Sequence, residues 1–171
     1  MKEWITTDNH FDHKNIVEYC GRPEDYEERI IKNLSVVGDD DILFNLGDFS
    51  LGKRTEYWAE RYMFANKAKK ILILGNHDNK SYTYYYKLGF DFVCRRASIK
   101  RYGKRIVLSH RPRRFFTEHI NIHGHMHNVD HRCNGFWDRK ILSYNRRKGR
   151  MRLVSIENTD YMPVTLETVI K

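Results

Sequence analysis

The sequence predicts an α/β fold in a single domain that spans residues 1–171. Short apolar runs that suit buried strands alternate with helix-like segments over the first half of the chain. Residues 71–74 form the clearest of these runs, because four apolar residues are followed at once by Gly75. After Gly89 the helix-like segments give way to short strand-like runs separated by turns, which predicts antiparallel hairpins in the second half.

The composition is that of a folded and strongly basic protein. The chain is 40% hydrophobic and 13% aromatic, and its 171 residues are enough for a sizeable core. No segment is long and apolar enough for a membrane span, and the first residues do not resemble a signal peptide, so we expect a cytoplasmic protein. Cys20, Cys94 and Cys133 lie far apart and are predicted to be unligated thiols.

The net charge of +9 indicates attraction to anions. Basic residues cluster at residues 95–96, 111–114 and 146–152. These clusters are interpreted either as a solvated basic surface or as a site for a phosphate-rich partner, such as a nucleotide or nucleic acid. Net charge alone does not decide between the two.

In the first half the expected elements alternate regularly. Strands are expected over residues 4–7, 42–46 and 71–74, and helices over residues 15–19, 24–37 and 55–67. The second helix follows Pro23 and begins with acidic residues that suit its positive end. Residues 81–88 are ambiguous, since their tyrosines suit a strand but their place between two strands favours a short helix.

In the second half the runs are shorter, and turns replace the helices. Strands are expected over residues 92–93, 97–102, 104–109, 120–122, 139–144 and 150–157. Residues 165–170 are expected to form a terminal strand or a helical turn.

Side chains that bind metal ions follow the ends of the apolar runs. They are Asp8 and His10, Asp48, Asn76 with His77, His110, and His125 with His127. Loops at the carboxyl ends of parallel strands converge on one crevice, so these side chains are expected to meet there. Their carboxylate, imidazole and amide groups suit Mn²⁺, Fe, Zn²⁺ or Ni²⁺ better than a structural zinc site.

The number of candidate ligands indicates two metal ions. Seven candidate ligands are too many for one tetrahedral ion, but they suit two ions that share a bridging carboxylate. Two divalent ions about 3.5–4 Å apart form a clamp for phosphoryl transfer. Asp48 is the natural bridge, because Gly47 before it lets the backbone approach closely.

The ordered blocks resemble the calcineurin-like metallophosphoesterase superfamily, whose pattern is D-x-H, G-D, G-N-H-[DE], H and G-H-x-H. All five blocks are present in this order from Asp8 to His127. The chain is also similar to small phage and bacterial phosphoesterases at residues 7–16, 22–23 and 161–164. The resemblance implies a β-sandwich of two mixed sheets flanked by helices.

The resemblance also implies a role for each residue of the site. The first ion takes Asp8, His10, Asp48 and His127, and the second takes Asp48, Asn76, His110 and His125. Asp48 bridges the ions, and a hydroxide that bridges opposite it attacks phosphorus. His77 faces the leaving oxygen as a general acid, and Asp78 orients its ring. Mn²⁺ is the favoured metal, with Fe, Zn²⁺ and Ni²⁺ as alternatives.

The predicted function is metal-dependent hydrolysis of phosphate esters, with phosphodiester or nucleotide substrates favoured by the short chain and its basic surroundings. Arg22, Arg111 and Arg113 are predicted to contact the substrate, because a guanidinium binds phosphate with two parallel hydrogen bonds. His13, the last residue of the first block, is also predicted to contact it. His13 also suits a surface position at a helix start. The alternatives are a phosphomonoesterase or protein phosphatase, a non-catalytic binding module on the same scaffold, and a basic nucleic-acid-binding protein.

Overall fold

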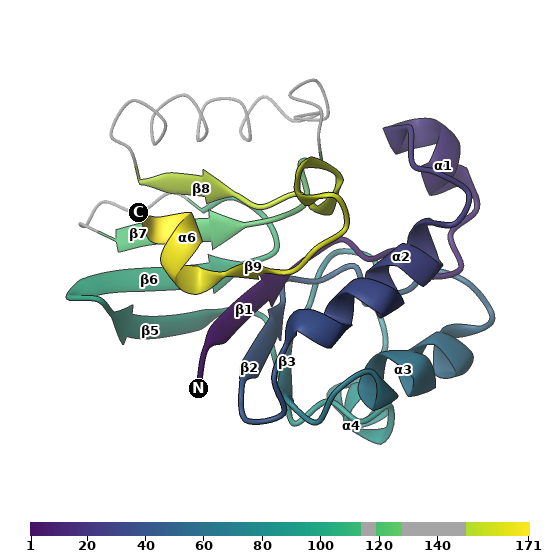
Figure 1. Cartoon of the computed structure of the whole chain (residues 1–171), viewed down its shortest axis with the longest axis horizontal. Coiled ribbons are helices and arrows are strands. Elements are labelled where there is room, and N and C mark those ends of the chain that lie inside the picture. The colour runs from purple at the N-terminus through teal and green to yellow at the C-terminus, as the bar shows by residue number, and fades with distance from the viewer. Residues whose placement is uncertain (114–118, 128–149) are drawn as a thin grey trace.

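The computed structural model describes residues 1–113, 119–127 and 150–171 and contains two packed sheets (Figure 1). The first sheet has the order β4-β3-β2-β1-β9, and the second has the order β5-β6-β7-β8. Strands of the first sheet are β1 (Glu3–Thr6), β2 (Ile42–Asn45), β3 (Lys69–Ile73), β4 (Phe92–Cys94) and β9 (Val164–Thr165). Strands of the second are β5 (Ala97–Arg101), β6 (Lys104–Ser109), β7 (His119–His123) and β8 (Met151–Leu153).

The first sheet is parallel from β1 to β4, as its alternation with helices predicted, and β9 adds an antiparallel edge. Successive side chains point to opposite faces of the sheet. Leu43 and Leu72 therefore face the helices, whereas Ile5, Phe44 and Ile73 face the second sheet. Both faces are covered, which explains why neighbouring residues such as Leu43 and Phe44 or Leu72 and Ile73 are apolar on both faces.

Helices cover the outer face of the first sheet (Figure 1). They are α1 (Asn15–Cys20), α2 (Tyr26–Asn33) with the 3₁₀ turn η1 (Leu34–Val36), α3 (Thr55–Phe64) and α4 (Tyr82–Lys87). Tyr26, Ile30 and Leu34 are buried along one side of α2 and η1, at the spacing of a single helix face. The ambiguous segment 81–88 forms α4, which starts where the Ser81 hydroxyl accepts a hydrogen bond from the Tyr84 amide.

The prediction of antiparallel hairpins in the second half is correct for β5 and β6 but wrong for the rest of the second sheet. β6, β7 and β8 are parallel, with Ser109 opposite His123 in the register. Parallel pairing places the carboxyl ends of β6 and β7 at the same edge, directly before the histidines of the last two motifs. The second sheet is therefore mixed, like the first.

The tail is less extended than predicted. Residues 150–157 contain the short strand β8, followed by the 3₁₀ turn η3 (Ile156–Thr159). β9 leads into α6 (Leu166–Ile170), where the Thr165 hydroxyl accepts a hydrogen bond from the Thr168 amide. The predicted strand 139–144 and Cys133 lie outside the described residues.

One apolar core lies between the helices and the first sheet, and a second joins the two sheets. It is built mainly of branched aliphatic residues: Ile5, Phe44, Leu46 and Ile73 on one side, and Ile106, Leu108, Ile122, Val154, Leu166 and Ile170 on the other. Complete burial of one such side chain stabilises a fold by about 1.5–3 kcal/mol, so this layer fixes the sheets against each other. Within the described residues, no helix has the length and hydropathy to cross a membrane.

Packing of the sheets brings five strand ends to one edge of the sandwich. The loops after β1 and β2 are joined by backbone hydrogen bonds from Asp8 to Gly47 and from His10 to Asp48, each 2.9 Å long. A 3.0 Å bond from the Gly124 amide to the His110 carbonyl joins the loops after β6 and β7. These loops carry the metal-binding motifs.

Candidate metal centre

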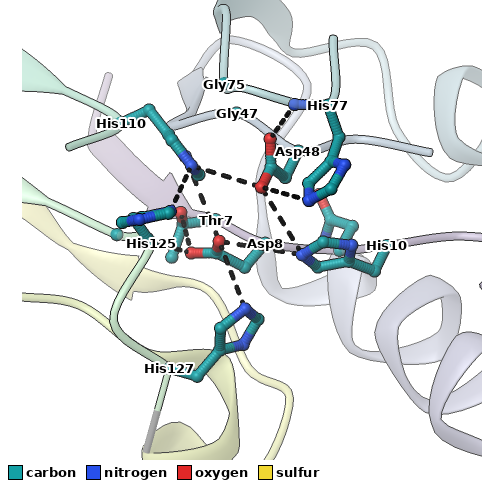
Figure 2. A network of polar contacts seen from close by, with 12 residues as sticks. Thr7, Asp8, His10, Gly47, Asp48, Gly75, His77, His110, His125 and His127 are labelled. Atoms are coloured by element: carbon teal, nitrogen blue, oxygen red, sulfur yellow. Dashed lines mark hydrogen bonds and ion pairs between the residues drawn. The ribbon is translucent and has the colours of Figure 1, made fainter. Parts of the chain in front are cut away.

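All seven predicted metal ligands lie on the loops that follow these strands. Figure 2 shows six of them meeting at one place: Asp8, His10, Asp48, His110, His125 and His127. Asp8 and His10 follow β1, Asp48 follows β2, Asn76 follows β3, His110 follows β6, and His125 and His127 follow β7. Six of them fall into two groups of three, each with ligand atoms within 4.8 Å of one another. The expected convergence of distant motifs is therefore present in the structure.

The first group contains Asp8, His10 and His127, all of which are buried. The Asp8 Oδ1 atom lies 3.9 Å from His10 Nε2 and 3.7 Å from His127 Nε2. Among the described residues, Asp8 Oδ1 and His10 Nε2 have no hydrogen-bond partner. Buried polar atoms are normally paired, so two unpaired ligand atoms that face each other fit a bound cation.

The second group contains Asp48, His110 and His125. His110 Nε2 lies 3.2 Å from Asp48 Oδ2 and 3.1 Å from His125 Nδ1. The amide oxygen of Asn76 is 3.0 Å from the same nitrogen, so it joins this group as a fourth candidate ligand. The donor set of carboxylate, amide oxygen and two imidazoles suits a divalent transition metal.

Asp48 lies between the two groups (Figure 2). Its Oδ2 atom is 3.6 Å from His10 Nε2 in the first group and 3.2 Å from His110 Nε2 in the second. Its Oδ1 atom accepts a 2.8 Å hydrogen bond from the His77 amide, which fixes the orientation of the carboxylate. The Asp48 carboxylate therefore lies within reach of both groups.

The backbone at the ligands adopts a conformation that side chains rarely allow. Asp8, His10, Asp48, His125 and His127 have φ angles of 51°, 52°, 53°, 68° and 49°. The left-handed region costs roughly 1–3 kcal/mol for such residues, and this strain concentrates at functional sites. Five of the seven candidate ligands share this conformation at one edge of the sandwich, which fits a common centre.

Glycines allow the ligand loops to pack this closely. A Cβ atom on Gly75 would lie 2.1 Å from Asp48 Oδ1, and one on Gly47 would lie 2.5 Å from the Gly75 amide nitrogen. On the opposite side, a Cβ on Gly124 would meet Thr7 Oγ1 at 2.0 Å. The structure thus confirms that the glycine before Asp48 serves close backbone approach.

Burial and close contacts shift the pKa values of the candidate ligands in both directions. Burial alone would raise the pKa of Asp48, but the hydrogen bond and charge of His110 hold it well below its usual range. The pKa of His110 is raised to about 9, because its contacts with Asp48 outweigh the opposing effect of burial. Burial lowers the pKa of His125 to about 3 and also lowers that of His10. His10 and His125 are therefore neutral near pH 7, the form that binds a metal ion.

Arg22 lies behind the first group, not at the surface where its predicted role in substrate binding would require it. Its guanidinium donates hydrogen bonds to the backbone oxygens of Asp8 at 2.7 Å and Asn9 at 2.9 Å. It also forms a 2.6 Å ion pair with Glu157, and its side chain is fully buried. The structure corrects the prediction: Arg22 holds the loop that carries Asp8 and is not available to a substrate.

Glu157 is a residue of the site that the sequence did not reveal. Its Oε1 atom lies 2.9 Å from His127 Nδ1, and its Oε2 atom accepts a 2.6 Å hydrogen bond from Ser155. Burial would raise the pKa of Glu157, but His127 and Arg22 hold it well below its usual range. A carboxylate on the second nitrogen of a histidine orients that ring toward a metal. Glu157 is 135 positions from Arg22, and no motif marks it.

Cys20 was predicted to be an unligated thiol, and it is buried near His127. With His127 and Glu157 it forms a third group close enough to hold a metal ion. The guanidinium of Arg22 already neutralises Glu157 at 2.6 Å, and its charge would repel another cation there. We therefore assign Cys20 to the packing around His127.

Asp78 differs from its predicted role of orienting the His77 ring. Its Oδ2 atom accepts hydrogen bonds from the amides of Asp48 at 2.8 Å and Gly75 at 2.7 Å, and its Oδ1 atom accepts one from Phe49 at 3.0 Å. Burial raises the pKa of this carboxyl. Asp78 thus fastens the loop after β3 to the loop after β2.

His77 and His13 lie at the mouth of the first group. The His77 side chain is 40% exposed, and its Nε2 atom is 4.0 Å from Asp48 Oδ2. His13 is half-buried, with its Nδ1 atom 3.3 Å from His10 Nδ1 and its ring centroid 6.4 Å from that of His77. Arg111 is exposed on the side of the second group, and its Nε atom is 3.4 Å from Asn76 Oδ1. These three residues can reach a substrate.

A sandwich of two mixed sheets, with two groups of aspartate and histidine ligands at its strand ends, is the architecture of a metallophosphoesterase. The family described as calcineurin-like phosphoesterase matches residues 1–156, and the chain belongs to this family. Membership indicates metal-dependent hydrolysis of phosphate esters.

Two relatives are similar to this chain in sequence, and one solved structure has the same fold over most of it. The uncharacterized protein MJ1445 of Methanocaldococcus jannaschii is 31% identical over 178 residues, which cover 99% of this chain and 90% of that protein. The Gene 66 protein of Mycobacterium phage L5 is 39% identical over 80 residues, or 44% of this chain and 39% of that protein. The crystal structure of the protein of unknown function AQ665 from Aquifex aeolicus superposes with a TM-score of 0.73 at 25% identity, covering 98% of this chain and 97% of that one.

Proposed function

We propose that the chain hydrolyses phosphodiester or nucleotide substrates at a centre of two divalent metal ions, with Mn²⁺ as the favoured metal. The observation that carries this proposal is the carboxylate of Asp48, which lies between two groups of ligands. The first ion would be held by Asp8, His10, Asp48 and His127, and the second by Asp48, Asn76, His110 and His125.

When bound, two such ions neutralise the charge of a phosphate and acidify the water that attacks it. The protein supplies the remaining chemistry with its own side chains. His77 has an exposed ring beside Asp48, so it can donate a proton to the departing oxygen of a substrate. Asp78 holds the loops that carry Asp48 and His77 together, because it accepts hydrogen bonds from backbone amides of both.

The surroundings of the centre favour diesters over monoesters. One cavity of ≈ 310 Å³ borders Asn76 and His110, and a second of ≈ 210 Å³ borders His77. A phosphodiester has a substituent on each side of phosphorus, and two cavities accommodate both. A phosphomonoester would use one cavity only, which is the alternative of a phosphomonoesterase or protein phosphatase.

Metal analysis and a pair of chromogenic esters test the proposal. The protein should bind two Mn²⁺ per chain and hydrolyse bis(4-nitrophenyl) phosphate faster than 4-nitrophenyl phosphate. Folded protein that shows no turnover with any divalent metal would overturn the enzymatic assignment and favour a binding module. Faster cleavage of the monoester would overturn the preference for diesters.

The role of His77 is tested by changing the leaving group. His77→Ala should lower kcat about 10²- to 10⁴-fold for thymidylyl-thymidine, whose alkoxide needs protonation on departure. The loss should be much smaller for bis(4-nitrophenyl) phosphate, because 4-nitrophenolate departs without a proton. Bound Mn²⁺ should be unchanged. His119→Ala, at the amino end of β7, is the matched control. Equal losses on both substrates would refute the acid role.

A further inference from the structure

We propose that the cavity beside the second ligand group binds a second phosphate of the substrate, on the side of the scissile ester that stays with the nucleoside. This inference rests on the proposed function. We call the cavity the cationic pocket. Its volume is ≈ 310 Å³, and the lining residues that carry the argument are Asn76, His110, Lys80, Arg95, Arg111 and Arg113.

Loops from both sheets build the cationic pocket. Lys80 lies on the loop after β3, Arg95 directly follows β4, and Arg111 lies two residues after the end of β6. Asn76 and His110 line the pocket and also belong to the second ligand group, so the pocket opens directly onto the metal centre. A phosphate in the pocket would therefore lie next to one held at the centre.

The charge of the pocket selects an anion. Four basic side chains line it, and Asp78 is the one acidic residue among the described lining. Both oxygens of Asp78 accept hydrogen bonds from backbone amides, at 2.7, 2.8 and 3.0 Å, so this carboxylate is directed into the protein. Clustered cations on a concave surface focus a positive potential, and guanidinium groups bind phosphate oxygens in pairs.

The cavity of ≈ 210 Å³ that borders His77 is less charged than the cationic pocket. It is lined by Phe49, Thr55, Tyr84 and Tyr85, and its only charged side chain among the described residues is Lys80, at the boundary with the cationic pocket. Because His77 borders this less charged cavity, the leaving group belongs there. The retained substituent then extends into the cationic pocket, where only an anionic substituent uses the four cations.

The second phosphate has two chemical sources: a sugar-spaced phosphate, as in an oligonucleotide, or an anhydride-linked phosphate, as in a nucleoside polyphosphate. Three esters that all release 4-nitrophenolate separate them. The reference is thymidine 5′-(4-nitrophenyl phosphate). The second ester carries an added 3′-phosphate, and the third is the β-(4-nitrophenyl) ester of thymidine 5′-diphosphate.

We expect a second phosphate to raise kcat/KM about tenfold over the reference for one of the two esters, at fixed Mn²⁺ and ionic strength. Arg111→Gln and Arg95→Gln should each reduce this ratio. Arg101→Gln is the matched control, because Arg101 pairs with Glu3 at the amino end of β1 and changes net charge equally. The control should keep the wild-type ratio.

Binding provides a readout that does not depend on turnover. Calorimetry with Mn²⁺ present should give thymidine 3′,5′-bisphosphate or thymidine 5′-diphosphate a Kd about tenfold lower than thymidine 5′-monophosphate, and Arg111→Gln should remove the difference. Equal kcat/KM for all three esters together with equal Kd values would overturn the pocket, while turnover of the reference ester would leave the proposed function intact. Selective binding of a second phosphate without turnover of any ester would overturn the proposed hydrolysis but not the pocket.

Discussion

The two halves of the candidate metal centre are held in different ways. The inner half, Asp8, His10 and His127, is buried and braced from behind by the pair of Arg22 and Glu157. The outer half centres on His110, includes the half-buried His125, and opens through exposed Asn76 toward the cationic pocket. The inner half is therefore held by buried charged partners, whereas the outer half borders a cavity.

The brace of the inner half is a buried ion pair with its hydrogen bonds satisfied. Arg22 donates to two backbone oxygens and to Glu157, and Glu157 also contacts His127 and Ser155. A buried pair of charges is tolerated when its remaining hydrogen bonds are made, and removing one partner leaves an uncompensated charge. The inner half should therefore be sensitive to residues that do not touch a substrate.

The largest effect is expected where the two halves meet. Asp48→Asn should lower kcat/KM for bis(4-nitrophenyl) phosphate on the order of 10³-fold and reduce bound Mn²⁺, because both halves share this carboxylate. Asp40→Asn, an exposed residue before the amino end of β2, is the matched control. Activity of Asp48→Asn within tenfold of the wild type would break the assignment of Asp48 as the bridge.

A smaller effect should be confined to the inner half. Glu157→Gln should weaken one of the two Mn²⁺ sites about 10- to 100-fold and leave the other unchanged, because it removes the carboxylate that orients His127. Titration of free Mn²⁺ by electron paramagnetic resonance measures both sites. Glu18→Gln, on the exposed side of α1, serves as the control.

Denaturant unfolding of the metal-free protein accompanies this titration. Glu157→Gln should lower the free energy of unfolding by about 1–3 kcal/mol, because Arg22 loses a charged partner. Equal weakening of both Mn²⁺ sites would show that the variant disturbs the fold generally, and would contradict the distinction between the two halves.

The smallest effect is expected at the mouth of the centre. His13→Gln should raise KM for bis(4-nitrophenyl) phosphate about fivefold, the value of roughly one hydrogen bond, with kcat and bound Mn²⁺ nearly unchanged. The half-buried His13 ring lies beside those of His10 and His77, where a substrate phosphate would enter. An unchanged KM would contradict substrate contact by His13 and favour the alternative that it is a surface histidine at a helix start.

Motif spacing predicted the candidate ligands because each motif is a local feature. A short apolar run that ends in Asp8, Asp48 or Asn76 predicts both a strand and a ligand at its end. The parallel arrangement of β6, β7 and β8 was not predicted, because short strands separated by turns look alike whether they pair in parallel or antiparallel. The cytoplasmic location and the roles of the site residues stay predictions.

The residues that support the ligands could not be assigned from their spacing. The guanidinium of Arg22 suggested a phosphate contact, but burial against Glu157 gives it a different role. Asp78 stands beside His77 in the chain, yet its carboxylate turns to the amides of Asp48, Phe49 and Gly75. Adjacency in the sequence does not determine where a side chain points once a loop folds back.

The sequence by itself determined the chemical identity and order of the ligands, since the strand ends and the side chains that follow them are encoded locally. Only the tertiary structure decided which distant charges pair, which ligands adopt left-handed backbone and which cations line the outer half. These features arise when the two sheets pack: desolvation then makes each buried charge depend on a partner that may be more than a hundred residues away, as Glu157 is from Arg22.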